Sequence, residues 1–307
     1  MRRMTEIRRV VVVFNPVARS RASDERRRAT QEALDGRGLD YTWLETTEKD
    51  PGTEMLREAL EKGPDLVMVS GGDGTVMACA TALANSGVPL ALLPAGTGNL
   101  LATNLDVPRD LSGALEVALS GGSRTIDVGS CPYGCFVIMA GMGFDAAMLR
   151  DADPKLKSRL GAVAYVMSGL KHVRAPAGRV ELRVDDAEPL ICEAHMILIG
   201  NIGKLQGGLT ALPDADPEDG LLTVAVVRAG TVGAWLKLLW RMCRGRRGDD
   251  PRVQTLSARR LHVTAEPAMP LELDGDVFED SSSFSVEVLP AALKLRVPAA
   301  RASGAVS

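Results

Sequence analysis

Aromatic side chains are scarce in this chain: 5 Phe, 3 Tyr and 3 Trp make up 4% of its 307 residues. This scarcity excludes the rows of stacking rings on which single-strand nucleic-acid binders depend. The chain also lacks a basic excess, since its net charge is −3, whereas nucleic-acid-binding proteins are usually basic. We therefore expect no nucleic-acid partner.

Metal-binding spacing is missing among the 5 cysteines and 3 histidines. Cys131 and Cys135 form the one close pair, and no histidine lies near them in the sequence. Unpaired thiols indicate a reducing compartment. No apolar run reaches the length of a membrane span, and Val10–Phe14 is too short for a secretory signal. We expect a cytoplasmic protein, and transient association with a membrane remains open.

The first third of the chain alternates strand-like and helix-like stretches. Apolar, β-branched runs predict strands at 9–14, 40–44, 65–69 and 89–93. The stretches between and after them predict helices at 23–34, 51–61 and 75–84. This order predicts a parallel sheet covered by helices on both faces.

After about residue 125 the pattern changes to short strands separated by Gly, Pro and Asp turns. We expect strands at 135–139, 180–184, 194–199, 221–227, 261–263 and 285–288. Helices are expected only at 154–173 and 232–242. The pattern is typical of an antiparallel sandwich or barrel. We therefore divide the chain into a Rossmann-like α/β domain at 1–125, an all-β domain at 126–297 and a disordered tail at 298–307.

Two glycine-rich turns each join a predicted strand to a predicted helix. They read VSGGDGTVM at 69–77 and LPAGTGNLLATNL at 92–104. Glycines let a backbone approach phosphate closely, and helix N-termini favour anions. The first turn lacks the lysine of a Walker A loop and carries Asp73 instead. By itself it could be a tight turn capped by Asp73 or Thr75, but two successive βα units bring both turns to one sheet edge.

In combination, SGGDGT and LPAGTGNLLA resemble the catalytic domain of the diacylglycerol kinase family, which includes soluble bacterial lipid kinases and the related sphingosine kinases. Asn15–Pro16 resembles the start of the family's NPxxG loop, with Arg19 where a glycine is usual. Weaker blocks follow in the family's order: Thr46 in ETTEK, GMGFDA at 141–146, PDADPEDGLL at 213–222 and LELDGD at 271–276. The last block resembles the family's DGE element, with Asp276 in place of glutamate.

The resemblance implies a Rossmann-like domain and a β-sandwich domain with the active site in the cleft between them. It implies transfer of the γ-phosphate of ATP, with Mg²⁺, to a lipid hydroxyl, diacylglycerol being the expected acceptor and phosphatidic acid the product. Asp274 would be the general base, with Asp276 beside it. Asp216, Asp219 and the carbonyl of Leu221 would hold a metal. The residues expected to bind the nucleotide are Asn15, Pro16, Thr46, Gly71, Gly72, Asp73, Gly74, Thr75, Val76, Met77, Gly96, Thr97 and Asn99.

Several alternatives stay open. Asp274–Gly275 alone predicts a β-hairpin turn, and the aspartates at 216 and 219 could belong to an acidic surface loop. Asp73 could act through Mg²⁺, through another cation, or by capping its own loop. A sphingoid-base or other long-chain alcohol kinase would share every motif. NAD kinases share GGDGT and a related fold, and a nucleotide-binding regulator without catalysis is a further alternative.

The stretch AWLKLLWRMCRGRR at 234–247 combines tryptophans and leucines with several cations in an acidic protein. It predicts either an interfacial helix on anionic lipid or an ordinary amphipathic helix packed on the all-β domain, which is the simpler interpretation. The residues that would contact lipid are Trp235, Trp240, Arg241, Arg244, Arg246 and Arg247. The oligomeric state stays open, a homodimer included.

Overall fold

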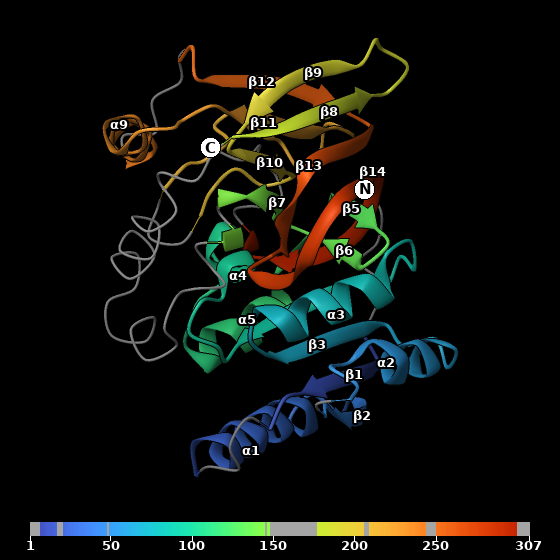
Figure 1. The fold of residues 1–307 in the computed structure, drawn as a ribbon. Helices are drawn as coiled ribbons and strands as arrows, with labels where there is room; N and C mark the ends of the chain where they lie inside the picture. The colour runs from blue at the N-terminus through green and yellow to red at the C-terminus, as the bar shows by residue number, and fades with distance from the viewer. Residues whose placement is uncertain are drawn as a thin grey trace. The chain divides into compact units, whose positions relative to one another are not determined.

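The structure is a computed structural model that describes residues 7–16, 21–47, 49–144, 146–147, 177–205, 209–243 and 250–299. It contains two compact units (Figure 1). Unit 1 runs to Ile126 and includes the chain again from Ala291, and unit 2 is Asp127–Pro290. The predicted helix at 154–173, Arg19 and most of the predicted tail lie outside the described residues.

Unit 1 is an α/β unit. Its strands are β1 (Arg9–Phe14), β2 (Asp40–Glu45), β3 (Leu66–Gly71) and β4 (Leu90–Pro94). Its helices are α1 (Arg21–Asp35), α2 (Thr53–Leu60), α3 (Asp73–Leu83), α4 (Leu100–Asn104) and α5 (Leu111–Ser120). The predicted strands and helices of this part are confirmed, and α5 is an addition that the sequence analysis missed.

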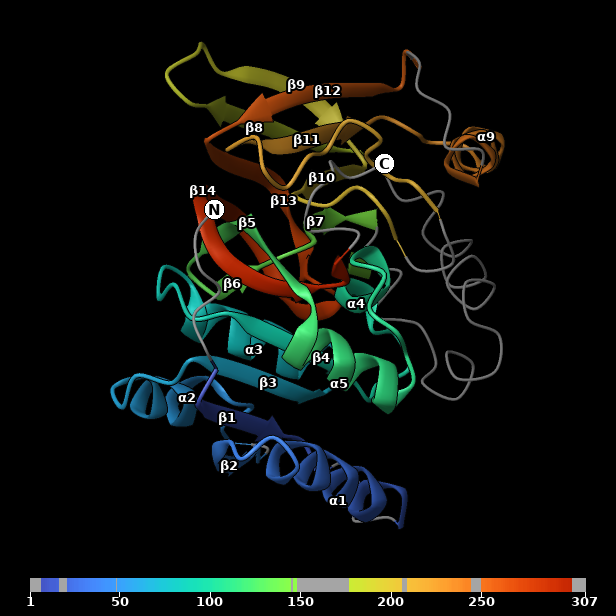
Figure 2. The same ribbon diagram turned by 180° about the vertical axis from the view of Figure 1, so that it is seen from behind.

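The four strands form a parallel sheet in the order β2-β1-β3-β4. Every residue of β3 and β4 is buried, whereas β2 at the edge is half-exposed. Helices α2 and α3 contact each other, and α1 contacts α5 (Figures 1 and 2). From β1 the chain adds β2 on one side of the sheet and then β3 and β4 on the other side. The strand order therefore reverses between β1 and β3, and open α/β sheets bind ligands at the carboxyl ends of the strands at such a switch point.

The last part of the chain also belongs to unit 1. Leu295 in β14 (Asp276–Val297) pairs in parallel with Leu90 of β4. The buried Arg296 donates from Nε to the carbonyl of Ala118 at 2.9 Å. The sequence analysis assigned residues up to 297 to the all-β domain, because a strand's own sequence does not say which sheet it will join.

Unit 2 is built from antiparallel strands. These are the later part of β5 (Gly122–Cys131), then β6 (Gly134–Phe136), β7 (Met139–Gly143), β8 (Gly178–Val184), β9 (Leu190–Ala194), β10 (Met196–Gly200), β11 (Leu222–Val227), β12 (Val253–Ala258), β13 (Arg260–Leu273) and the earlier part of β14. They follow the order β12-β11-β10-β7-β13-β14, and β8 pairs with β13 and β9. One helix, α9 (Val232–Cys243), is described here. The predicted antiparallel all-β architecture is confirmed.

Three strand predictions in unit 2 differ from the structure. The run 135–139 was expected to be one strand, but β6 ends at Phe136 and β7 begins at Met139. The expected strands at 261–263 and 285–288 are pieces of the much longer β13 and β14. Strand β12 was not predicted, because its exposed polar residues hide the apolar pattern. The break after Phe136 has a specific cause in hydrogen bonds to a half-buried aspartate, described below.

Candidate active site

The carboxyl ends of three parallel strands of unit 1 are tied together by hydrogen bonds. Asn15, which follows β1, donates its backbone N–H to the carbonyl of Ser70 at 2.9 Å. Its side-chain Nδ2 donates to Oγ1 of Thr75 at 3.0 Å. Ala95, which follows β4, donates its N–H to the carbonyl of Gly71 at 3.1 Å. The predicted loops therefore meet at the switch point of the sheet.

Glycines allow the two loops to touch backbone to backbone. A Cβ added to Gly96 would lie 2.7 Å from Cα of Gly72, closer than real Cβ atoms approach. A Cβ added to Gly71 would lie 2.7 Å from Cβ of Thr75. A side chain at either position would force the loops apart, so the glycines serve this packing as well as any approach of a ligand.

Asp73 connects the first loop to the second. Its Oδ2 accepts the backbone N–H of Asn99 at 3.0 Å, and its Oδ1 accepts that of Leu100 at 2.7 Å. These N–H groups belong to the start of α4, which has no other side-chain cap. Asp73 therefore caps the other loop's helix, not its own, and its negative charge is directed at N–H dipoles. The acidic residue in this glycine-rich loop is therefore explained by its hydrogen bonds to the second loop.

The same contacts make the two helix N-termini unequal. Asp73 occupies the start of α4, whereas Gly72, the N-cap of α3, offers no side chain to the first turn of α3. The first N–H groups of a helix have no partner within the helix and favour anions. The start of α3, which includes Gly74 and Thr75, is thus the better place for phosphate.

Asn99 has a structural role in the second loop. It is buried and adopts a left-handed conformation with φ 49°. Its Oδ1 accepts the N–H of Gly96 at 3.0 Å and its Nδ2 donates to the carbonyl of Gly96 at 2.6 Å. The side chain is therefore used inside the loop, although the sequence analysis expected it to bind nucleotide.

The remaining nucleotide-site candidates also lie at this edge of the sheet. Thr46 follows β2, is buried, and donates its N–H to the carbonyl of Phe14 at 2.9 Å. Pro16 is half-buried next to Asn15, and Thr97 is exposed in the second loop. The order β2-β1-β3-β4 and the parallel direction of the strands place all of them at the carboxyl edge, as predicted.

Arg26 is a residue that the sequence analysis missed. From α1 it donates through Nε to Oγ of the buried Ser70 at 3.0 Å, and through Nη2 to the carbonyl of Pro94. These acceptors are the last residues before the two glycine loops. Burial lowers the pKa of the guanidinium, so an anion nearby would offset its desolvation. In the described residues Arg26 has no carboxylate partner, and it is the first of three consecutive arginines, Arg26 to Arg28, so the sequence gave no signal that distinguished it.

We expect Arg26→Met to weaken ATP binding about tenfold, because it removes charged hydrogen bonds that hold both strand ends. Arg26→Lys should recover only part of the loss, since one ammonium cannot reproduce the planar fork. Calorimetric titration with ATP measures the effect. Arg27→Met is the matched control: Arg27 pairs with Glu45 and lies over the ring of Trp43. Equal affinities for the Arg26 and Arg27 variants would contradict the positioning role.

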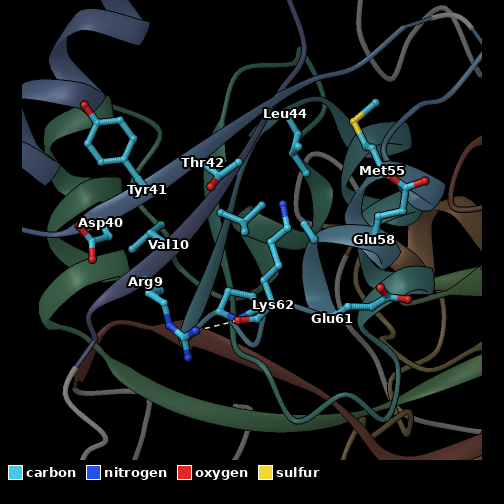
Figure 3. Close-up of a pocket in the computed structure, with 13 residues that line it drawn as sticks. Arg9, Val10, Asp40, Tyr41, Thr42, Leu44, Met55, Glu58, Glu61 and Lys62 are labelled. Carbon is cyan, nitrogen blue, oxygen red and sulfur yellow. Dashed lines mark hydrogen bonds between the residues drawn. The ribbon is translucent and has the colours of Figure 1, made fainter.

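A hollow in unit 1 lies away from these loops. It measures about 520 Å³ and is lined by the amino-terminal ends of β1 and β2 and the end of α2 (Figure 3). Arg9 there donates to the carbonyl of Lys62 at 2.8 Å. The carboxyl end of α2 carries partial negative charge, which disfavours phosphate. This hollow is therefore distinct from the phosphate-type loops at the opposite edge of the sheet.

In unit 2, Asp274 lies in a two-residue hairpin turn between β13 and β14. Both Asp274 and Gly275 have positive φ, at 47° and 94°, as a type I′ turn requires. The Asp274 carboxylate accepts the backbone N–H groups of Val137 at 2.7 Å, Ile138 at 2.9 Å and Met139 at 2.8 Å. The turn interpretation is thus confirmed, and this carboxylate explains the break between β6 and β7.

Buried polar side chains continue this network. Asn201, which is fully buried, donates from Nδ2 to the carbonyls of Asp127 at 2.8 Å and Val137 at 2.9 Å. Asp127 in turn accepts the N–H of Gly220 through Oδ2 at 2.7 Å. Glu272, also buried, accepts the N–H of Gly275 at 2.9 Å. Asp276, the other predicted catalytic residue, is exposed at the start of β14. The sequence analysis found neither Asn201 nor Glu272.

The acidic loop before β11 holds the predicted metal ligands. Asp216 accepts the N–H of Glu218 at 3.1 Å, and Asp219 accepts that of Leu221 at 2.9 Å. Burial, followed by the charges of Asp216 and Asp127, raises the pKa of Asp219. Oxygen ligands of this kind suit a hard cation. However, no group of three His, Cys, Asp or Glu side chains able to hold a metal occurs in the described part of the chain, so any cation here would need backbone oxygens as well.

Comparisons with known proteins agree with both units. The sequence model described as "Diacylglycerol kinase catalytic domain" matches residues 9–131. The model described as "YegS C-terminal NAD kinase beta sandwich-like domain" matches residues 138–297, more than half of the chain. Together these matches define a kinase. The chain belongs to the diacylglycerol kinase family, and the suspected resemblance is confirmed.

Individual relatives cover nearly the whole chain. A protein of Klebsiella pneumoniae named "Probable lipid kinase YegS-like" is 31% identical over 292 residues, covering 90% of this chain and 93% of that one. A diacylglycerol kinase of Mycobacterium tuberculosis is 28% identical, covering 96% and 97%. A diacylglycerol kinase structure from Bacillus anthracis has the same fold, with a TM-score of 0.74, 21% identity, and coverage of 96% and 99%. None of the helices described here has the length and apolarity needed to cross a bilayer.

Proposed function

We propose that this kinase transfers the γ-phosphate of ATP, with Mg²⁺, to the hydroxyl of diacylglycerol and so produces phosphatidic acid. The observation that carries this proposal is the start of α3. Its first turn has no side-chain cap, and Asp73 fixes the neighbouring loop by hydrogen bonds to Asn99 and Leu100. A rigid, uncapped helix start is suited to hold a triphosphate. The family names of the relatives support a lipid as the acceptor.

The residues divide into separate roles. Asn15, Thr46, Thr97 and the backbone of Gly71–Met77 would bind ATP. Phosphoryl transfer depends on positioning and on neutralising charge, which Mg²⁺ supplies when it is bound with the nucleotide. Asp274 would orient the lipid hydroxyl and accept its proton, with Asp276 as the nearby second carboxylate. Asp216, Asp219 and the carbonyl of Leu221 would hold a second, structural cation.

Other acceptors are ranked below diacylglycerol. The fold is also similar to an NAD kinase of Archaeoglobus fulgidus solved in complex with ATP, with a TM-score of 0.51 and 16% identity. This similarity concerns the fold alone. A long-chain or sphingoid-base alcohol would use the same loops and is separated from diacylglycerol only by the acceptor pocket. A regulator that binds nucleotide without catalysis would keep the start of α3 and transfer no phosphate.

The direct test uses ATP labelled at the γ-phosphate, with diacylglycerol micelles, sphingosine and NAD offered in parallel. We expect label in diacylglycerol, and its loss when EDTA removes Mg²⁺. Label in sphingosine or NAD instead would overturn the proposed acceptor and name the correct one. Binding of ATP without transfer to any acceptor would favour the regulator. A Gly96→Ala variant serves as the negative control, because its Cβ would clash with Gly72.

A further inference from the structure

Helix α9 has an apolar side that packs on unit 2. These residues are Ala234, Trp235 and Leu238. They pack against Val227, the last residue of β11, and against Ala229, which follows this strand. The ring of Trp235 stacks on Phe144, with centroids 3.9 Å apart and an angle of 17° between planes. This confirms that one face of α9 is an ordinary packing face. It also removes Trp235 from the residues that could contact a membrane.

A second apolar row on α9 faces solvent. Val232, Leu236 and Trp240 are 37%, 53% and 47% exposed. Their spacing of four residues places them in one row along the helix. They are three of the five large hydrophobic side chains that are exposed in the described parts of the chain. We call these three residues the outer row. Packing on unit 2 uses the other face of the helix, so it does not explain the outer row.

Cations lie beside the outer row. Lys237 follows Leu236 in the sequence, and Arg241 follows Trp240 one turn later. The Lys237 Nζ lies 3.9 Å, and the Arg241 Nη1 3.8 Å, from Oδ2 of the buried Asp250. The sequence then continues with Arg244, Arg246 and Arg247. This local excess of positive charge occurs in a chain whose net charge is −3. Figures 1 and 2 show α9 at the margin of unit 2, beside the strands and not among them.

We propose that the outer row docks on an anionic lipid surface, with α9 lying in the plane of the interface. Leu236 and Trp240 would enter the boundary between headgroups and acyl chains, while Lys237, whose side chain is 56% exposed, would extend its charged end to lipid phosphates. Arg241 would stay beside Asp250. Each cation near such a surface strengthens attraction to anionic lipid. The inference rests on the proposed lipid acceptor, because an enzyme whose substrate resides in a bilayer must reach that bilayer.

A second copy of this chain is a poorer occupant of the same surface. A two-fold contact centred on α9 would bring Lys237 and Arg241 close to their own copies, and like charges oppose such a contact. Stable protein interfaces also use about 20–30 residues on each side, whereas the outer row has three. A lipid surface needs no such area, because several small contributions from apolar insertion and charge are sufficient.

The test measures binding of the full chain to vesicles by co-sedimentation, without ATP. We expect binding to phosphatidylcholine vesicles that contain phosphatidylglycerol and much weaker binding to phosphatidylcholine alone. Leu236→Asn and Trp240→Gln should each weaken binding about tenfold, since each withdraws a large apolar side chain from the interface. Lys237→Gln should weaken binding to the anionic vesicles only. Ile191→Asn is the matched control, because Ile191 on β9 is as exposed as Leu236, at 53%.

Three outcomes would overturn the proposal. The first is that the unaltered chain does not bind anionic vesicles. The second is that the Leu236→Asn and Ile191→Asn variants bind these vesicles equally well. The third is that analytical sedimentation shows a dimer of the unaltered chain that Leu236→Asn dissociates. Phosphorylation of a water-soluble, short-chain diacylglycerol separates this proposal from the proposed function. Leu236→Asn should leave that activity unchanged. If no variant phosphorylates the short-chain acceptor while vesicle binding follows the prediction, the acceptor is wrong and the docking surface stands.

Discussion

Replacing Asp274 with asparagine is expected to destabilise unit 2 as well as to stop phosphoryl transfer. Asparagine is as suitable as aspartate at a positive φ before glycine, so the turn itself should survive. The change converts one carboxylate oxygen into an N–H donor, although the carboxylate accepts three backbone N–H groups. We expect a loss of about 3 kcal/mol in the free energy of unfolding, from a lost charged hydrogen bond and an unpaired N–H group.

Two measurements on the same variant separate structure from chemistry. Thermal unfolding should show a midpoint lower by roughly 6–12 °C, given the usual relation between free energy and midpoint for a domain of this size. Kinase activity should be measured well below that midpoint. Lost activity with unchanged stability would make Asp274 a purely chemical base and contradict its structural role. Full activity with lowered stability would remove it from catalysis.

Asp276→Asn is the companion variant. Asp276 is exposed at the start of β14, and exposed substitutions usually change stability by less than about 0.5 kcal/mol. If Asp276 assists the acceptor hydroxyl, its variant should lose activity with little change in the unfolding midpoint. An unchanged rate would leave Asp274 as the single catalytic carboxylate of this turn.

Replacing Asp73 with alanine is expected to weaken ATP binding by at least about tenfold. The carboxylate makes charged hydrogen bonds to the N–H groups of Asn99 and Leu100, each worth about 1.5–3 kcal/mol when charged groups are involved. Without this carboxylate the second loop loses its attachment to the first loop. The N–H groups of Asn99 and Leu100 would also lose their acceptor and could compete with the start of α3 for the phosphate groups of ATP. The start of α3 would then no longer be held in one position.

The matched control is Asp110→Ala in the same unit. Asp110 caps α5 by accepting the N–H of Gly113 at 2.8 Å, so its loss should cost about 1 kcal/mol of stability and leave ATP affinity unchanged. Calorimetric titration and thermal unfolding of both variants give the two quantities. If Asp73→Ala binds ATP as tightly as Asp110→Ala does, the coupling of the two loops is irrelevant to nucleotide binding.

Much of the architecture was accessible from the sequence. The runs that form β1, β3 and β4 are apolar throughout because both faces of a central parallel strand are buried, and this local signal needs no knowledge of neighbours. The glycines of the two loops were equally visible, since few other residues tolerate such close backbone approach. The order of strands and helices then placed both loops at one edge of the sheet.

The partners of the polar side chains were not accessible in the same way. Asp73 and Asn99 were expected to contact nucleotide, yet both are used to shape the loops. Arg26 was indistinguishable from the arginines next to it until the fold brought it to Ser70 and Pro94. Asp274 reaches residues 137 positions away along the chain. Hydrogen bonds over such separations depend on the final packing of strands.

The sequence by itself determined the α/β and all-β parts, the two glycine loops and the family. Those features rest on local patterns of apolar residues, glycine and turn chemistry, which act over a few neighbouring positions. Only the tertiary structure decided that Asp73 caps the second loop, that Asp274 fixes the break before β7, and that α9 turns Leu236 and Trp240 outward while Trp235 packs inward. Each of these contacts depends on which residues from distant parts of the sequence lie beside a given side chain. Their positions are set by the packing of the whole unit.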